Sequence, residues 1–263
     1  MKSPSIATRP LIQRLAVIVA VVIQIGATFL PQLGFGEPIG NRSDSVRTLI
    51  TPSGWAFAIW GPLFLGSAIF AIWQALPGQR QNRLLNRIAW PAAIALAAQG
   101  VWATYTQFEN LTFVSVLIIL VSLAGLLVCL RALTEQSELT AGERWFAGLV
   151  LSALAAWLTA ASIVNISASL VYHEVFTSNA SPLWAAIMVA IGGVIAALAT
   201  VRSRGNPWYA LVFGWALLAI YFRGGQEASS IAWACIFSGV LVLMGCAVGL
   251  MDKANRRHWL GIS

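Results

Sequence analysis

The side chains in this chain that are best suited to bind another molecule are aromatic rings and amides that lie inside long apolar segments. Three amides, Gln24, Gln99 and Asn165, are embedded in hydrophobic sequence. Five tryptophans occupy similar interior positions: Trp60, Trp102, Trp157, Trp215 and Trp233. The other seven, Trp259 among them, lie at or near the ends of these segments, where we expect an interfacial aromatic belt. Rings offer stacking and apolar contact, whereas amides offer hydrogen bonds. Such groups can bind a hydrophobic molecule or can pack helices together, and the sequence leaves both interpretations open.

Catalytic and metal chemistry find little support in the sequence. His173 and His258 lie at the ends of apolar segments, where we expect them to be solvated. Cys129, Cys235 and Cys246 lack the paired spacing of a metal site or a disulfide framework. Because no acid pair, metal cluster or nucleophile with a base is visible, we predict no obligatory cofactor and no metal site. A photochemical, tryptophan-assisted reaction is an alternative without support from composition.

The composition indicates an all-α integral membrane protein. Of the 263 residues, 59% are hydrophobic and only 10% are charged. Backbone groups in lipid must be hydrogen-bonded internally, so long apolar segments predict helices. Eight segments qualify, at about 11–33, 51–73, 87–108, 111–133, 144–172, 182–201, 207–223 and 229–251. A cleaved signal peptide is an alternative interpretation of the first segment, but the length of that segment favours a membrane helix. Residues 34–52 form the longest predicted loop.

The basic residues predict the orientation of these helices. The net charge of +7 is spread over short loops, which favours a role in membrane topology over nucleic-acid binding. With the N-terminus in the cytoplasm, only Arg42, Arg47 and Arg223 of the 16 lysines and arginines lie outside. We therefore predict eight spans with both termini cytoplasmic, in a bacterial cytoplasmic membrane.

Two segments have a face suited to a ligand. Phe57, Trp60 and Phe64 follow the spacing i, i+3, i+7 and share one helix face, beside gaps at Gly61 and Gly66. On the fifth predicted helix, one continuous face comprises Trp157, Ala161, Val164 and Asn165. A neighbouring helix or a flat ligand could approach either face closely.

Three motifs in these segments resemble the translocator protein / tryptophan-rich sensory protein family (TspO/MBR). They are Trp55-Ala-Phe57-Ala-Ile-Trp60-Gly61-Pro on the second helix, Gln99-Gly-Val-Trp102 on the third, and Trp157, Ala161 and Asn165 on the fifth. Gln99 replaces the usual asparagine, Ala58 a proline, and Ala155-Ala156 a Pro-Tyr pair. These departures bear on ligand specificity more than on fold.

The resemblance, which covers about residues 10–175, implies both a fold and a ligand site. It implies a five-helix bundle over residues 1–175 and leaves 176–263 as a three-helix extension. The family binds porphyrins, and in some members sterols, in a pocket below the first loop, which would act as a lid. Together with the aromatic face of the second helix, the predicted site is Phe57, Trp60, Phe64, Trp102, Trp157, Ala161, Val164 and Asn165.

The sequence therefore predicts a membrane receptor or carrier for a flat hydrophobic ligand, such as a porphyrin, haem or a sterol-like molecule. Porphyrin degradation is implied only by proposals for some family members. An ion-coupled transporter is less favoured because the interiors of the spans lack ionisable residues. A structural or assembly protein is a further alternative. Gly245 with Gly249, and Gly193 with Ala197, could support a homodimer, although packing within the chain is favoured.

Overall fold

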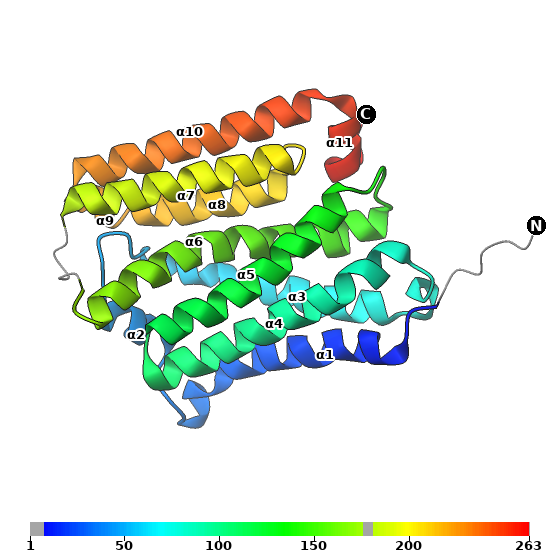
Figure 1. Ribbon diagram of the computed structural model, residues 1–263, viewed down its shortest axis with the longest axis horizontal. Helices are drawn as coiled ribbons and strands as arrows, with labels where there is room; N and C mark the ends of the chain where they lie inside the picture. Colours follow the sequence, from blue (N-terminus) through cyan, green and yellow to red (C-terminus); the bar gives the residue numbers. More distant parts are fainter. Residues whose placement is uncertain (1–7, 176–180, 263) are drawn as a thin grey trace, which may run out of the picture.

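In the part of the chain that the structure describes, eight segments fold into helices of 15 residues or more (Figure 1). The computed structural model describes residues 8–175 and 181–262, and every regular element in these two ranges is a helix, which confirms the all-α prediction. The long helices are α1 (Leu11–Gly26), α3 (Trp60–Ala75), α4 (Arg83–Glu109), α5 (Phe113–Thr134), α6 (Leu149–Tyr172), α7 (Pro182–Arg202), α8 (Pro207–Tyr221) and α10 (Ser229–Met251). Shorter helices are α2 (Ile39–Ser45), α9 (Gly224–Glu227) and α11 (Lys253–Leu260).

Six helical segments among the described residues are long and apolar enough to cross a membrane. They are Leu11–Phe29, Gly54–Ala75, Phe113–Thr134, Glu143–Tyr172, Pro182–Arg202 and Ser229–Met251. The helix α4 is long enough but carries more polar residues, and α8 has only 15 residues. Both run alongside the other long helices (Figure 1). The count of eight crossings therefore stays a prediction.

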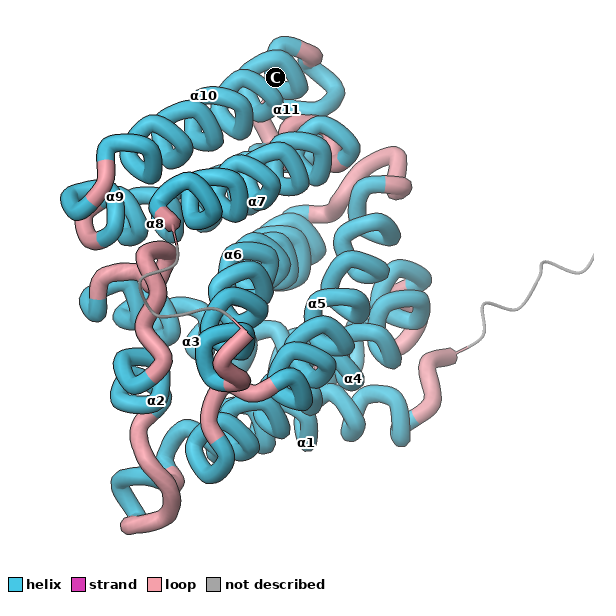
Figure 2. The backbone as a smooth tube through the Cα atoms, turned by 60° about the vertical axis from the view of Figure 1, so that its left-hand side comes forward, coloured by secondary structure: helices cyan, strands magenta, loops and turns pink. Residues whose placement is uncertain are grey.

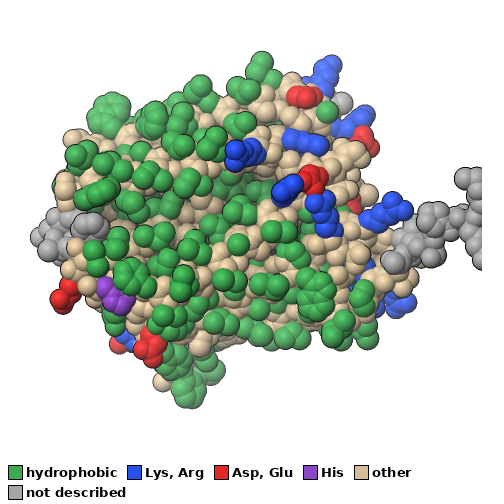
Figure 3. Space-filling model, in the orientation of Figure 1, with side chains coloured by type: hydrophobic (Ala, Val, Ile, Leu, Met, Phe, Trp, Pro, Cys, Tyr) green, Lys and Arg blue, Asp and Glu red, His purple; other side chains and the backbone are tan. Residues whose placement is uncertain are grey.

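Charged side chains gather at the two ends of the bundle, and hydrophobic side chains cover its middle (Figure 3). The start of α1 and the helix α11 lie at the same end, where most of the visible lysines and arginines are found. Arg131 and Arg87 both pair with Glu135 at this end. This distribution matches a bundle that crosses a bilayer. Which end faces the cytoplasm stays a prediction.

The helix α6 is the centre of the fold. In its most apolar window 78% of the residues are buried, against 33–39% for the other five candidate spans. It packs against α3 and α5, which precede it in the chain, and against α7 and α8, which follow it, as the views in Figures 1 and 2 also show. The segment that leads directly into it, Glu143–Gly148, is wound as a π-helix. Both halves of the chain thus share one buried helix. The predicted boundary at 175–176 adjoins residues outside the described ranges.

Small residues form the seam between α7 and α10. A side chain on Gly193 would collide with Ser238, and one on Gly245 would touch Val201 at 3.0 Å. A side chain on Gly249 would meet the backbone of Gly205 at 2.5 Å. These glycines are therefore used for close packing within the chain.

The C-terminal helix α11 was not predicted, and it corrects two predictions. His258 is 2% exposed rather than solvated, and Trp259 is fully buried rather than interfacial. The Trp259 Nε1 donates to the Ser203 carbonyl at 2.8 Å, and Arg144 Nε donates to the His258 carbonyl at 2.9 Å. Burial, reinforced by nearby arginines, lowers the pKa of His258 to about 4. The cause of both errors is tertiary, since α11 folds back against the end of the bundle.

Candidate functional site

The segment that leads into α3 is wound more tightly than the α-helix that the sequence predicts there. Residues Gly54–Ile59 form a 3-10 helix, and the α-helix begins only at Trp60. Phe57 therefore lies on the 3-10 turn and does not continue the face of an α-helix. The Trp60 and Phe64 rings are stacked, with centroids 5.0 Å apart. The predicted aromatic face exists, although its first member is placed by a different helical geometry.

The helix α6 brings the predicted fifth-helix motif to this aromatic face. The Trp157 ring lies 5.9 Å from Trp60 and 6.5 Å from Phe57, edge-on to both. Edge-to-face rings at this separation attract one another through their quadrupoles. Phe57 and Trp60 thus form one cluster with Trp157, which lies about 100 positions later in the sequence.

The larger of two adjoining cavities lies beside this cluster and has a volume of about 390 Å³. Aromatic side chains form much of its wall: Phe57, Trp60, Phe64 and Trp102. Polar side chains complete it, among them Gln24, Gln99, Gln107, Asp44 and Arg223. Its volume falls within the range typical of ligand pockets, roughly 300–1,000 Å³.

The smaller cavity, of about 50 Å³, lies against α6. Its wall includes Trp157, Ala161, Val164 and Asn165, and it shares Phe57, Trp102 and Ile39 with the larger cavity. All eight predicted site residues therefore line one cavity or the other. The structure gathers them in one region but divides them between two spaces, with Phe57 and Trp102 common to both.

The buried amides both link helices and face the cavities. Gln24 donates to Gln99 between α1 and α4, and Ser115 donates to Asn165 Oδ1 between α5 and α6 at 2.8 Å. The remaining atom of each amide, Gln24 Oε1, Gln99 Nε2 and Asn165 Nδ2, has no partner among the described residues. The indole Nε1 atoms of Trp102 and Trp157 are likewise unpartnered. An unsatisfied buried polar group costs about 1–3 kcal/mol, so these atoms are ready to bind a ligand's polar groups.

Sequence reasoning missed the charged residues at the mouth of the larger cavity. Arg223 comes from the end of α8, and Asp44 from α2, a helix that was predicted as loop. The two side chains pair at 2.8 Å across 179 positions of sequence. The predicted position of Arg223 at the outer end of the segment at about 207–223 was the only available signal, and it did not indicate which other segment the side chain would face.

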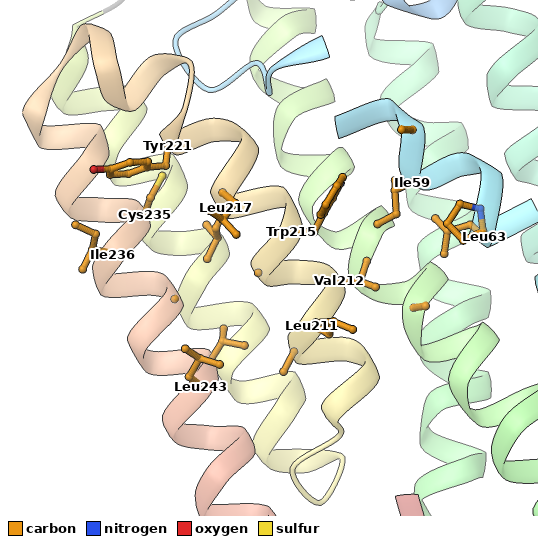
Figure 4. Close-up of a pocket in the computed structure, with 18 of the residues that line it drawn as sticks. Ile59, Leu63, Leu211, Val212, Trp215, Leu217, Tyr221, Cys235, Ile236 and Leu243 are labelled. Atoms are coloured by element: carbon orange, nitrogen blue, oxygen red, sulfur yellow. The ribbon is translucent and has the colours of Figure 1, made fainter. Parts of the chain in front are cut away.

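A third hollow was also not predicted, and it lies on the flank of the bundle between α3, α8 and α10 (Figure 4). It has a volume of about 880 Å³ and a mainly hydrophobic wall that includes Ile59, Leu63, Trp215 and Leu243. Leu211 and Leu243 are 68% and 65% exposed beside it. The Trp215 Nε1 is already bonded to the Ala56 carbonyl at 3.1 Å. This groove suits apolar chains, but it offers fewer free polar groups for orienting a ligand than the inner cavities.

Within residues 8–175 and 181–262, no three histidine, cysteine or acidic side chains are grouped closely enough to hold a metal ion. The described walls of the two inner cavities offer apolar contact, stacking and hydrogen bonds, together with the charges of Asp44 and Arg223.

Comparison with known families finds one whose model covers most of the chain. The family model described as TSPO-like protein matches residues 10–248. The match extends past residue 175 through α7, α8 and most of α10, further than the three motifs that carry the resemblance. No curated protein and no solved structure matches the chain.

Proposed function

Since the chain belongs to the TSPO-like protein family and is an integral multi-pass membrane protein, we propose that it is a receptor or carrier for a flat hydrophobic ligand of the tetrapyrrole type. The observation that carries this proposal is the larger inner cavity, in which aromatic rings lie beside buried polar atoms without partners. Such sites bind ligands mainly through apolar surface and orient them with a few polar groups.

The aromatic wall favours a planar ligand. The nearly parallel Trp60 and Phe64 rings, 24° apart, form one side of the cavity, and Trp102 contributes another part of the wall. A planar conjugated ring can make extended contact with such surfaces, whereas a bulky globular molecule cannot. Sterol-like molecules, which are also flat, are the second ligand class that this wall suits.

The segment that covers the cavity is suited to act as a lid. Ile39, Gly40 and Asp44 of α2 line the cavity, and Arg42 donates to the Gln107 carbonyl of α4 at 3.0 Å. The Glu37 amide donates to the same carbonyl at 2.9 Å. Hydrogen bonds to α4 and ion pairs of Asp44 with Arg223 and of Arg47 with Glu227 hold the segment, and these contacts can break without disturbing the helices behind it.

An ion-coupled transporter remains the alternative function. Coupled transport normally uses ionisable residues at membrane depth. The ionisable side chains that line the larger cavity, Asp44 and Arg223, belong to segments outside the six candidate spans. We therefore favour ligand binding for sensing or carriage over coupled transport. We also propose, from the distribution of the basic residues, that the chain lies in a bacterial cytoplasmic membrane with both termini in the cytoplasm.

The proposal is tested by titrating the purified protein with protoporphyrin IX and following tryptophan fluorescence. We expect saturable quenching with one ligand per chain, because Trp60, Trp102 and Trp157 surround the adjoining cavities. Non-saturable quenching equal to that of an unrelated membrane protein would reject tetrapyrrole binding. Uptake that depends on a proton or sodium gradient would instead favour the transporter.

A further inference from the structure

The larger cavity is lined by an ion pair between Asp44 of α2 and Arg223, which directly follows the end of α8. Arg223 Nη2 donates to Asp44 Oδ1 at 2.8 Å, and Nη1 donates to the Pro52 carbonyl at 3.0 Å. Among the described residues that line this cavity, these two are the only ionisable side chains. The basic side chain on the described wall of this cavity therefore comes from the end of α8.

The two partners of this pair differ in burial. The Asp44 side chain is 62% exposed, whereas that of Arg223 is 22% exposed. An exposed carboxylate that leaves its partner is hydrated again at little cost. A mostly buried guanidinium that loses its partner needs another anion close by. Arg223 is thus able to exchange one carboxylate for another.

Arg223 is held in place mainly by α8 and its contacts with the entry to α3. The Ser53 amide donates to the Ala219 carbonyl at 3.1 Å, four residues before Arg223. Trp215, also on α8, donates to the Ala56 carbonyl at 3.1 Å. Because neither contact involves α2, displacement of Asp44 would leave the guanidinium where it is.

The cavity wall also offers polar atoms that are far more buried than Asp44 and Arg223. Gln24, Gln99 and Trp102 are 1%, 3% and 6% exposed, and each has an unpartnered polar atom. The aromatic wall of Phe57, Trp60 and Phe64 belongs to the same cavity. This arrangement fits a ligand with an apolar planar body and an anionic group at its edge.

Building on the proposed function, we propose that Arg223 is a specificity-determining residue that selects ligands carrying a carboxylate. The ligand carboxylate takes the place of Asp44 on the guanidinium, and no covalent bond changes. Asp44 is then released to solvent, so ligand binding loosens one attachment of α2. The three-helix extension thereby supplies a charge that the five-helix bundle does not place at this cavity.

The test compares two probes that share one planar ring, protoporphyrin IX and its neutral dimethyl ester, on the full chain in zwitterionic nanodiscs. Each probe is compared between wild type and variant, so that its partition into lipid cancels. We expect Arg223→Gln to weaken binding of the acid about tenfold or more, because a hydrogen bond between charged groups contributes about a factor of ten to affinity. The affinity for the ester should not change, because the ester has no carboxylate to pair with the guanidinium. We expect Asp44→Asn to strengthen binding of the acid, because it removes the competing carboxylate.

Arg47→Gln is the matched control. Arg47 pairs with Glu227 and so also joins the lid segment to α9, but it does not line the cavity. Neither probe should respond to this change. Equal loss of acid and ester binding in Arg223→Gln would show a merely structural role and overturn the inference, as would unchanged acid binding. If the wild type binds the ester and shows no dependence on Arg223, tetrapyrrole binding stands and only the inference fails. If the wild type binds neither probe, both proposals fail.

Discussion

Replacing Trp60 with alanine is expected to lower the affinity for protoporphyrin IX about tenfold to a hundredfold. The Trp60 ring lines the larger cavity, stacks on Phe64 and receives the edge of Trp157. Its removal takes away the largest apolar surface at the junction of these rings. Contact of this size is worth roughly 1.5–3 kcal/mol, which corresponds to the stated change in affinity. The measurement is a fluorescence titration of the variant beside the wild type.

Trp233→Ala is the matched control for this prediction. It also removes one tryptophan, but Trp233 is 68% exposed on α10 and lines neither inner cavity. Its affinity should equal that of the wild type, and thermal melts of both variants should confirm that they are folded. Equal affinity of a folded Trp60→Ala variant would mean that these aromatic residues only pack the helices.

Replacing Gly249 with leucine is expected to destabilise the protein strongly. A Cβ atom at this position would lie 2.5 Å from both the amide nitrogen and the Cα of Gly205. The atoms that a new side chain would meet belong to the backbone, which cannot move aside as a side chain can. Gly205 has a φ of +71°, a conformation that favours glycine, so the turn between α7 and α8 cannot adjust easily. Overpacking usually costs about 1–3 kcal/mol, and we expect a value at or above the top of this range. A thermal melt in detergent measures the loss.

Gly214→Leu provides the comparison for this change. Gly214 lies on α8, and no heavy atom within 4 Å would meet a Cβ atom there. Its melting temperature should stay close to that of the wild type. If Gly249→Leu instead melted normally and changed only the oligomeric state, α10 would be a surface for a homodimer, and packing within the chain would not explain its glycines.

Several features of the site could be predicted from the sequence because they depend on local periodicity. Trp157, Ala161 and Asn165 follow helical spacing within one uninterrupted apolar segment, and the structure places all three on the wall of one cavity. The long apolar segments likewise predicted the all-α fold class, because backbone groups in lipid must be hydrogen-bonded within helices.

The remaining features depend on contacts between distant segments. Arg223 reaches the cavity because α8 packs beside the entry to α3, and no local pattern contains that information. The helix α11 buries His258 by folding back, although its own sequence has the charge density of a solvated end. Phe57 was expected on an α-helix, but the chain forms a 3-10 turn where Ser53 is tied to α8.

The central claim is that the ligand occupies the larger inner cavity, and the most direct test is to fill that cavity. Ala103 is 4% exposed and lines the larger cavity only, whereas Leu218 lines only the groove on the flank and is 50% exposed. The measurement is protoporphyrin IX affinity of folded Ala103→Phe and Leu218→Phe variants. We predict loss of saturable binding in Ala103→Phe and unchanged binding in Leu218→Phe. Unchanged binding in Ala103→Phe together with loss in Leu218→Phe would place the ligand in the groove and contradict the account.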